Sequence, residues 1–344
     1  MVIAEDVLTH NNQLIFPKGL ILTDKSITRM EFFSIMYVRV EEELAVSDEE
    51  SEVPSYAERL KETPEFVEFK NVFENDIATL KTSLNDIIDK GAPLDTKALL
   101  NDTIGLITAS DSHVNVFDML HNMREYDDDT YAHAVNVALI CNVFARWLRL
   151  TPEEIDIATM SGLLHDIGKM KIPDEIMKKP DKLTSQEYRI VKKHCQEGFK
   201  ILAHYDLHKG IKNAALMHHE RNDGSGYPYG LLADKIDFYA KMVAIADVYD
   251  AMTSARIYRG PLCPFVVISV FENEGLQKYD TRFIMTFLEN IVNTYLLHRV
   301  RLSNGAEGEV VYINRAHLSK PTVKCGKQYL DLAKHPEIYI EALI

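Results

Sequence analysis

Histidine and aspartate residues recur in this chain within segments that are otherwise strongly apolar. His165 and Asp166 directly follow the apolar run 155–164 and precede Gly168 and Lys169. A neighbouring imidazole and carboxylate at the end of a buried helix can bind one cation, or two cations side by side. Gly168 permits a sharp turn at this point, and Lys169 adds a positive charge beside the pair. The segment is therefore a candidate metal-binding site.

Further histidines and aspartates occupy similar surroundings at four other places in the sequence. These are His133, His194, the pair His218 and His219, and Asp247. Any one histidine of this kind is most simply explained as a hydrogen-bonded core or surface residue. Burying the whole set without basic partners would be very costly, because each unpaired polar group loses its hydration. The set therefore predicts a metal centre, and its mixed imidazole and carboxylate ligands suit Fe, Mn, Zn or Ni.

Several helices must converge to bring these residues together. Hydrophobic residues follow a period of about 3.6 between residues 130 and 299, with interruptions at 178–182 and 224–230. A capping box that begins at Thr184 predicts the start of the helix that carries His194. The fold is therefore expected to be mainly α, with small β-rich segments towards the two ends of the chain.

Changes in composition divide the chain into four parts. We expect a small β-rich module over residues 1–44, and an acidic linker followed by a helical region over 45–122. The helical domain that carries the histidines is expected over 123–300, and a C-terminal β-rich segment over 301–344. The linker prediction depends on the run of acidic residues from 42 to 52, which is typical of a solvated segment.

The overall composition restricts the class of ligand and the compartment. The 344 residues are 46% hydrophobic, which is ample for a packed core. Lys and Arg number 38 against 52 Asp and Glu, and the net charge of −14 disfavours binding to DNA or to anionic lipid. The N-terminus lacks the features of a signal peptide, and no apolar run approaches the ~18 residues of a membrane span. Four widely spaced cysteines are typical of reduced thiols, so a cytoplasmic location is expected.

Three segments of the sequence match the motifs of one known family. They are HDIGK at 165–169, HHERNDGSGYP at 218–228 and IADVYDAMTSARIYR at 245–259. In these segments the chain resembles the HD-GYP family, a branch of the HD phosphohydrolases whose members degrade the bacterial second messenger cyclic di-GMP. The resemblance covers about residues 125–275 and implies that 123–300 is the catalytic domain. It also implies an HD-type helical bundle around two or three divalent metal ions, Fe or Mn ahead of Zn or Ni.

The resemblance implies a specific set of metal ligands, with Asp166 bridging two ions. The set consists of His133, His165, Asp166, His194, His218, His219 and Asp247. Some members of the family have a Glu four residues before the first histidine, where it recruits a third metal. Asp129 occupies that position in this chain, and it is equally well explained as a helix N-cap. The number of metal ions therefore stays open between two and three.

Other residues of the motifs are implied in substrate binding. Lys169 resembles the family lysine that contacts the scissile phosphate. Arg256 and Arg259 match the basic pair that holds the nucleotide phosphates. Gly226 and Tyr227 shape the loop beside the ligand, because glycine allows a tight fold there.

The implied activity is hydrolysis of cyclic di-GMP to pGpG, to GMP or to both, by in-line attack of a metal-bridging hydroxide. Lys169 would stabilise the developing charge or help to protonate the leaving 3′-oxygen. Ala255 and Ile257 stand where the family commonly has Asp and Pro. Two alternatives therefore stay open: a phosphohydrolase for another cyclic dinucleotide such as cyclic GMP-AMP, and a non-catalytic protein that binds cyclic di-GMP. A homodimer and GGDEF-type or other signalling partners are left open as well.

Overall fold

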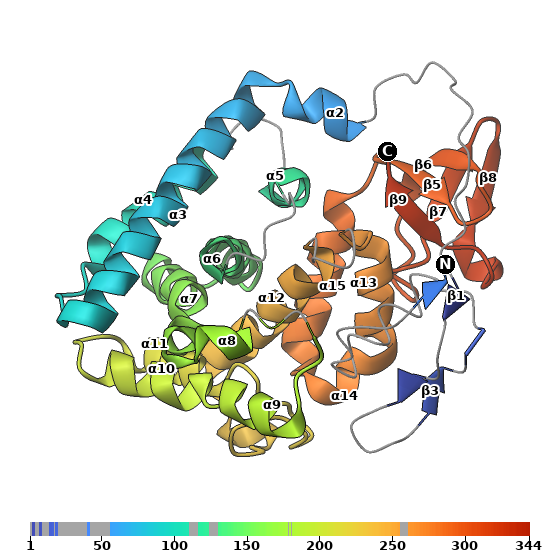
Figure 1. The fold of residues 1–344 in the computed structure, drawn as a ribbon. Helices are drawn as coiled ribbons and strands as arrows, with labels where there is room; N and C mark the ends of the chain where they lie inside the picture. Colours follow the sequence, from blue (N-terminus) through green and yellow to red (C-terminus); the bar gives the residue numbers. More distant parts are fainter. Residues whose placement is uncertain are drawn as a thin grey trace.

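The computed structural model confirms that the fold is mainly α (Figure 1). The structure describes residues 2–3, 7–8, 14–16, 18–19, 40–41, 56–109, 116–123, 130–177, 179, 181–254 and 261–344. The acidic stretch 42–52 and most of the expected N-terminal module lie outside the described residues. In the described part of the chain, no helix is both long enough and apolar enough to cross a lipid bilayer.

Five helices form the bundle at the centre of the molecule. They are α6 (Thr130–Trp147), α7 (Pro152–Leu164), α10 (His194–Ala203), α11 (Lys209–Met217) and α12 (Phe238–Thr253). Residues 134–142 of α6 are buried without a break, which is typical of a helix enclosed on all sides. Helix α7 packs along α6 and also contacts α11 and α12. These contacts place the end of α7 at the middle of the bundle.

Short segments connect α7 to α10. They are the 3₁₀ turn η1 (Ile167–Lys171), α8 (Asp174–Met177) and α9 (Ser185–Val191). Thr184 caps α9 with the predicted capping box, but the expectation that His194 lies on this capped helix is wrong. The Val191 carbonyl accepts a hydrogen bond from His194 Nδ1 at 2.7 Å, and His194 starts the separate helix α10. The break lets the imidazole of His194 turn into the bundle.

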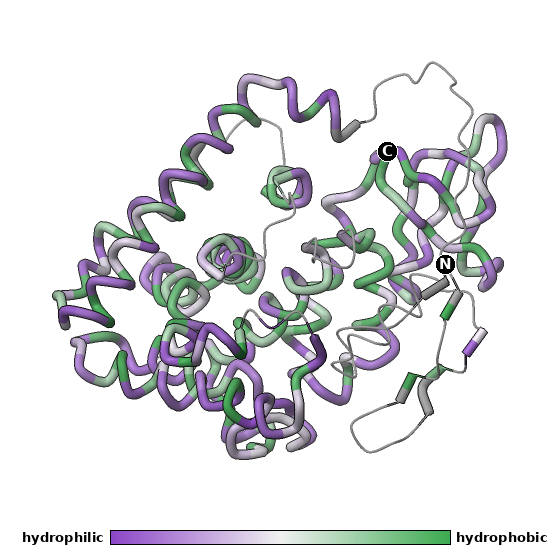
Figure 2. Tube along the Cα trace, in the orientation of Figure 1, coloured by the Kyte–Doolittle hydropathy of each residue, from purple (hydrophilic) through white to green (hydrophobic). Residues whose placement is uncertain are grey.

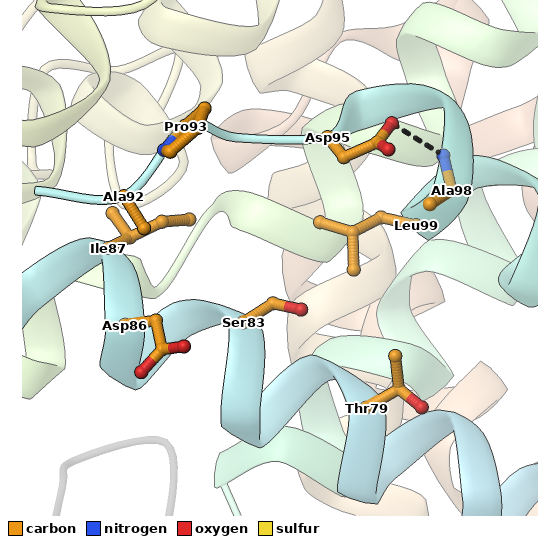
Figure 3. Close-up of a pocket in the computed structure, with 9 residues that line it drawn as sticks. All are labelled: Thr79, Ser83, Asp86, Ile87, Ala92, Pro93, Asp95, Ala98 and Leu99. Carbon is orange, nitrogen blue, oxygen red and sulfur yellow. Dashed lines mark hydrogen bonds between the residues drawn. The ribbon is translucent and has the colours of Figure 1, made fainter.

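Four further helices cover one side of the bundle. They are α2 (Tyr56–Lys61), α3 (Pro64–Lys90), α4 (Thr96–Ala109) and α5 (Val116–Met123). Helix α3 carries hydrophobic and hydrophilic residues in alternation along its length (Figure 2), and it packs against α4, α5 and α6. A pocket lies where α3 leads into α4, lined by residues between Thr79 and Leu99 (Figure 3). No lining residue of this pocket belongs to the predicted metal or substrate site.

The chain continues after α12 into helices that complete the core. They are α13 (Pro264–Val270), the π-helical segment η3 (Phe271–Gly275), α14 (Leu276–Lys278) and α15 (Thr281–Thr294). Phe287 of α15 lies at the centre of an aromatic cluster, where its ring meets Phe144, Trp147 and Tyr249 edge to face. Such pairs stabilise a core beyond their buried area. They join α15 to α6 and α12.

A five-stranded antiparallel sheet closes the chain, with the strand order β8-β7-β6-β5-β9. Its strands are β5 (Arg299–Leu302), β6 (Glu307–Tyr312), β7 (Thr322–Cys325), β8 (Gln328–Asp331) and β9 (Ile340–Leu343), with the turn η4 (Leu332–Lys334) between the last two. Glu272 of η3 accepts hydrogen bonds from the backbone amides of Leu318 and Ser319, at 2.5 and 3.0 Å. The sheet is thus attached to the helical part by a buried hydrophobic contact and by a carboxylate.

The described N-terminal residues form short strands. Strand β1 (Val2–Ile3) pairs with β4 (Val40–Glu41), and β2 (Val7–Leu8) pairs with β3 (Leu14–Phe16).

One further element lies in the helical part of the chain: the 3₁₀ turn η2 (Ala233–Lys235) precedes α12.

Candidate metal centre

The bundle brings the predicted ligands together from five places in the fold. His133 lies on α6, and Asp247 lies on α12. His165 and Asp166 follow the last residue of α7, so they lie where that helix ends inside the bundle. The remaining histidines come from the start of α10 (His194) and from the end of α11 (His218 and His219).

Asp166 lies at the middle of this cluster. Its Oδ2 atom is 3.1 Å from His165 Nε2, 3.7 Å from His133 Nε2 and 2.5 Å from Lys169 Nζ. Its Oδ1 atom is 3.3 Å from His194 Nε2 and 3.6 Å from His218 Nε2. The two carboxylate oxygens therefore face different histidines, which is the arrangement that a bridging carboxylate requires.

Asp247 forms a second point of convergence. Its Oδ1 atom is 3.1 Å from His133 Nε2, and its Oδ2 atom is 4.0 Å from His219 Nδ1. The ligand atoms of His133, His165 and Asp247 lie within 4.8 Å of one another, as do those of His165, Asp166 and His218. Two neighbouring sets of donors are thus available for cations.

Backbone carbonyls hold three of the imidazoles in one orientation. The Nδ1 atoms of His165, His194 and His218 donate to the carbonyls of Gly162, Val191 and Ala214, at 2.6, 2.7 and 3.0 Å. A carbonyl oxygen can only accept, so each Nδ1 carries the proton. The Nε2 lone pair of each ring is then directed at the cluster, in the tautomer that binds metal.

Sequence reasoning missed Asp250, which orients the fourth imidazole. Asp250 is buried on α12, one turn beyond Asp247, and its Oδ2 atom accepts from His133 Nδ1 at 2.7 Å. A carboxylate behind a ligand histidine fixes the tautomer and raises its basicity. The available signal was a second Asp three residues after Asp247 in an otherwise apolar segment.

Glu220 is a second residue that sequence reasoning left without a role. It is buried, and its carboxylate accepts from the backbone amides of Tyr229 and Leu231, each at 2.8 Å. These bonds fold the loop back over the cluster, where the Tyr227 ring stacks on His219 with centroids 4.5 Å apart. A Cβ atom at Gly226 would collide with the backbone of residues 219–221. Gly226 therefore packs against the backbone of His219, and Tyr227 packs against its ring.

Gly168 is needed for close packing, and not for the sharp turn that the sequence led us to expect. Its backbone is outside the left-handed region. A Cβ atom there would clash with the His194 carbonyl and the Gly198 amide. The absence of a side chain lets η1 lie directly on α10, which brings Asp166 to His194.

Burial and neighbouring charges set the protonation of the cluster. Burial lowers the pKa of His194 to about 4 and also lowers the pKa values of His218 and His219. Burial opposes ionisation of Asp166, but the neighbouring imidazole of His165 and the Lys169 ammonium hold its pKa well below the usual range. Burial alone would lower the pKa of His133, whereas hydrogen bonds to Asp247 and Asp250 raise it to about 9. Most of the ligands are therefore in the protonation state that binds metal.

The donor atoms themselves indicate a cation site. His165 Nε2 and Asp166 Oδ1 are buried and make no hydrogen bond among the described residues, whereas Asp166 Oδ2 is paired with the Lys169 ammonium. Buried polar atoms without such partners are costly. Divalent metal ions would satisfy them, and mixed imidazole and carboxylate ligands are the chemistry such ions prefer.

Three predicted residues cannot be placed in the cluster. Asp129, Arg256 and Arg259 lie outside the described residues. Lys169 is placed with its ammonium on Asp166 and a partly exposed side chain.

Known proteins match the part of the chain that carries this cluster. A family model described as HD domain matches residues 116–283. The chain is 36% identical over 237 residues to the cyclic di-GMP phosphodiesterase PA4108 of Pseudomonas aeruginosa, which covers 68% of this chain and 56% of that protein. It is 39% identical over 148 residues to the 3′3′-cGAMP-specific phosphodiesterase 2 of Vibrio cholerae, which covers 42% of this chain and 28% of that protein.

A solved structure shows the same fold. Bd1817, a HDG"Y"P protein from Bdellovibrio bacteriovorus, matches with a TM-score of 0.51 and 15% identity, over 85% of this chain and 95% of that one. The chain spans only about half the length of PA4108 and less of the Vibrio protein. Taken with the HDIGK and HHERNDGSGYP motifs, these matches show that the chain belongs to the HD-GYP branch of the HD domain family.

Proposed function

We propose that this protein is a metal-dependent phosphodiesterase that hydrolyses cyclic di-GMP to pGpG, to GMP or to both. One observation carries the proposal: five histidines and two aspartates meet inside the bundle, with the Lys169 ammonium at the edge of the cluster. The name of the relative PA4108 supports cyclic di-GMP as the substrate.

The residues that would hold the metal ions are the seven predicted ligands, with Asp166 between two ions. We propose two or three divalent ions. Imidazole and carboxylate ligands suit Fe, Mn, Zn and Ni alike, and the family resemblance favours Fe or Mn over Zn or Ni. When bound, such ions supply positive charge beside a phosphodiester and lower the pKa of water towards neutrality. Asp129, if it is a ligand, would account for a third ion.

The protein's own residues orient the ligands and supply a further cation. Asp250 and the carbonyls of Gly162, Val191 and Ala214 hold the imidazoles, so the donor atoms need not reorganise during the reaction. Lys169 Nζ rests on Asp166, and 24% of its side chain is exposed against 3% for Asp166. Its ammonium is therefore available to a phosphate oxygen that enters from solvent, or to the leaving 3′-oxygen.

The test combines metal analysis of anaerobically purified protein with chromatographic assay of cyclic di-GMP turnover. We expect two or three divalent ions per chain and formation of pGpG or GMP. Asp166→Ala should abolish metal retention and turnover, and full turnover by this variant would contradict the proposal.

Lys169→Met is expected to reduce the turnover rate by on the order of 10²–10³, because it removes one preorganised charge from the reacting phosphate. Lys171→Met is the matched control, since Lys171 ends the same 3₁₀ turn but is exposed. Metal content should be unchanged in both variants. Equal rates for the two variants would exclude a direct role of Lys169.

A second candidate function is hydrolysis of cyclic GMP-AMP. It is supported by the similarity to the 3′3′-cGAMP-specific phosphodiesterase 2 of Vibrio cholerae. Relative rates on a panel of cyclic dinucleotides would separate the two substrates.

Binding of cyclic di-GMP without turnover in the Mn(II) or Fe(II) form would instead favour a non-catalytic signalling protein. A cytoplasmic location, a homodimer and GGDEF-type partners belong to the same proposal.

A further inference from the structure

Cys195 lies inside the histidine cluster, although it belongs to none of the three family motifs. Its thiol is fully buried on α10, and its Sγ atom is 3.4 Å from the Nε2 atom of the adjacent His194. The ligand atoms of His194, Cys195, His218 and His219 all lie within 4.8 Å of one another. The sulfur therefore occupies a place that a metal ligand could occupy.

The spacing of these atoms fits a single ion. His194 Nε2 and His218 Nε2 are 3.2 Å apart, and Cys195 Sγ is 3.4 Å from the former. A tetrahedral ion with bonds of about 2.0 Å to nitrogen and about 2.3 Å to sulfur holds such donors roughly 3.3–3.6 Å apart. The two observed separations, 3.2 and 3.4 Å, are close to two edges of that tetrahedron.

A second observation indicates a cation at the same point. Asp166 is 3% exposed, and its Oδ1 atom makes no hydrogen bond within the described part of the chain. This atom lies 3.3 Å from His194 Nε2 and 3.6 Å from His218 Nε2. A buried acceptor directed at two imidazole nitrogens, each with its proton on the opposite nitrogen, is expected beside a bound cation.

The other cysteines show that burial by itself does not produce this arrangement. Cys141 and Cys263 are also buried and free. Neither belongs to a group of metal-ligating side chains among the residues that the structure describes. Buried cysteines of that kind act as small apolar side chains.

We propose that Cys195 Sγ is a direct ligand of the metal ion held by His194, His218 and His219. On binding, the thiol gives its proton to solvent and the thiolate joins the metal. The inference rests on the metal centre proposed above, and it adds a ligand that the family motifs do not contain. Because thiolate is a soft ligand, it should favour Zn or Fe over Mn at this position.

The test is spectroscopic and independent of turnover. The full chain is stripped with a chelator and reloaded with Co(II), which develops a near-ultraviolet sulfur-to-cobalt charge-transfer band when a thiolate binds. X-ray absorption of the Zn(II) form should show a sulfur neighbour at about 2.3 Å. We expect both signals in the unmodified protein. We expect Cys195→Ser to lose them while Cys141→Ser, the matched control, retains them.

Several outcomes would overturn the inference. They are the absence of both signals in the unmodified protein, their persistence in Cys195→Ser, and failure of the chain to bind Co(II) or Zn(II). The first result needs no variant, so it holds even if Cys195→Ser fails to fold. A chain with the sulfur signals that hydrolyses no cyclic dinucleotide would support Cys195 as a ligand and contradict the proposed function. A chain that hydrolyses a cyclic dinucleotide but lacks the sulfur signals would support the proposed function and contradict Cys195 as a ligand.

Discussion

His133 lies between two carboxylates, and these two groups change the pKa of its imidazole. Its Nε2 atom faces Asp247 at 3.1 Å, and its Nδ1 atom donates to Asp250 at 2.7 Å. Burial opposes the charge, but the two hydrogen bonds raise the pKa of His133 to about 9. A metal ion that binds Nε2 must displace that proton, so proton and metal compete for one atom.

This competition predicts how stability depends on pH. Protein stripped of metal by a chelator should be more stable at pH ~6.5 than above pH ~9. Below pH ~6.5 the lowered pKa values of His194, His218 and His219 act in the opposite direction. A histidine with a raised folded-state pKa stabilises the fold fully below its unfolded pKa, and this contribution is lost as pH rises through the folded value. The contribution is at most about 3 kcal/mol. Thermal unfolding of the stripped protein across this range measures it.

Two controls accompany the pH series. Asp250→Asn removes one of the two carboxylates and should flatten the pH dependence. The stability of metal-loaded protein should not depend on pH in this way, because metal replaces the proton on His133. A stripped protein whose unfolding temperature stays level through this range would contradict the assignment of the raised pKa to His133.

At the scale of elements, the site depends on how closely η1 and α10 approach each other. Gly168→Ala is expected to destabilise the fold by about 1–3 kcal/mol, because the added methyl group meets the backbone of His194 and Gly198. It should also weaken metal binding, since it moves Asp166 away from His194. Denaturant unfolding and metal titration measure the two effects.

Gly105→Ala provides the comparison for this change. Gly105 lies within α4, and a Cβ atom there would have nothing within 4 Å. Alanine is the better helix former, so this variant should be as stable as the parent or about 0.5–1 kcal/mol more stable. Equal destabilisation of both variants would rule out the close approach as the cause.

The sequence predicts some parts of the site from local patterns and misses others that depend on how the elements pack. Most of the seven proposed ligands lie in or beside apolar segments where a His or Asp is conspicuous, and the family motifs connect them. Asp250 is on the same kind of segment, but its role follows from the packing of α12 against α6, which no local pattern encodes. The place of His194 at the start of α10 depends on its own bond to the Val191 carbonyl, a detail the capping signal at Thr184 could not reveal.

At the scale of the whole molecule, the helical class and the C-terminal strands could be predicted from periodicity, and the bundle was implied by the family resemblance. The way the sheet attaches could not, because it depends on contacts between distant segments. Glu272 lies in the π-helical turn η3, and its carboxylate binds two amides some 46 residues further along the chain. The sheet and the α3–α4 pair lie on opposite sides of the bundle in Figure 1.

Glu272→Gln should loosen this attachment. The amide offers one acceptor oxygen in place of two and turns a donor towards a backbone N–H group, at a cost of about 1.5–3 kcal/mol. Hydrogen exchange at Leu318 and Ser319 should accelerate, while exchange within α6 stays slow. Glu274→Gln, on the same turn but paired with Lys278 at 3.7 Å, is the control and should leave both unchanged. Unaltered exchange at Leu318 and Ser319 would show that the carboxylate does not hold the sheet.

The convergence of five chain segments on one cluster has a consequence for the lifetime of the protein. His133 and Asp247 are 114 residues apart in sequence, so an ion that joins their surroundings acts as a cross-link across most of the bundle. A ligand that binds only the folded chain stabilises it by about 4 kcal/mol when it is present at a thousandfold excess over its dissociation constant. The supply of metal would then decide how often a molecule unfolds and meets a protease. Metal scarcity would lower the number of molecules as well as the occupancy of each one.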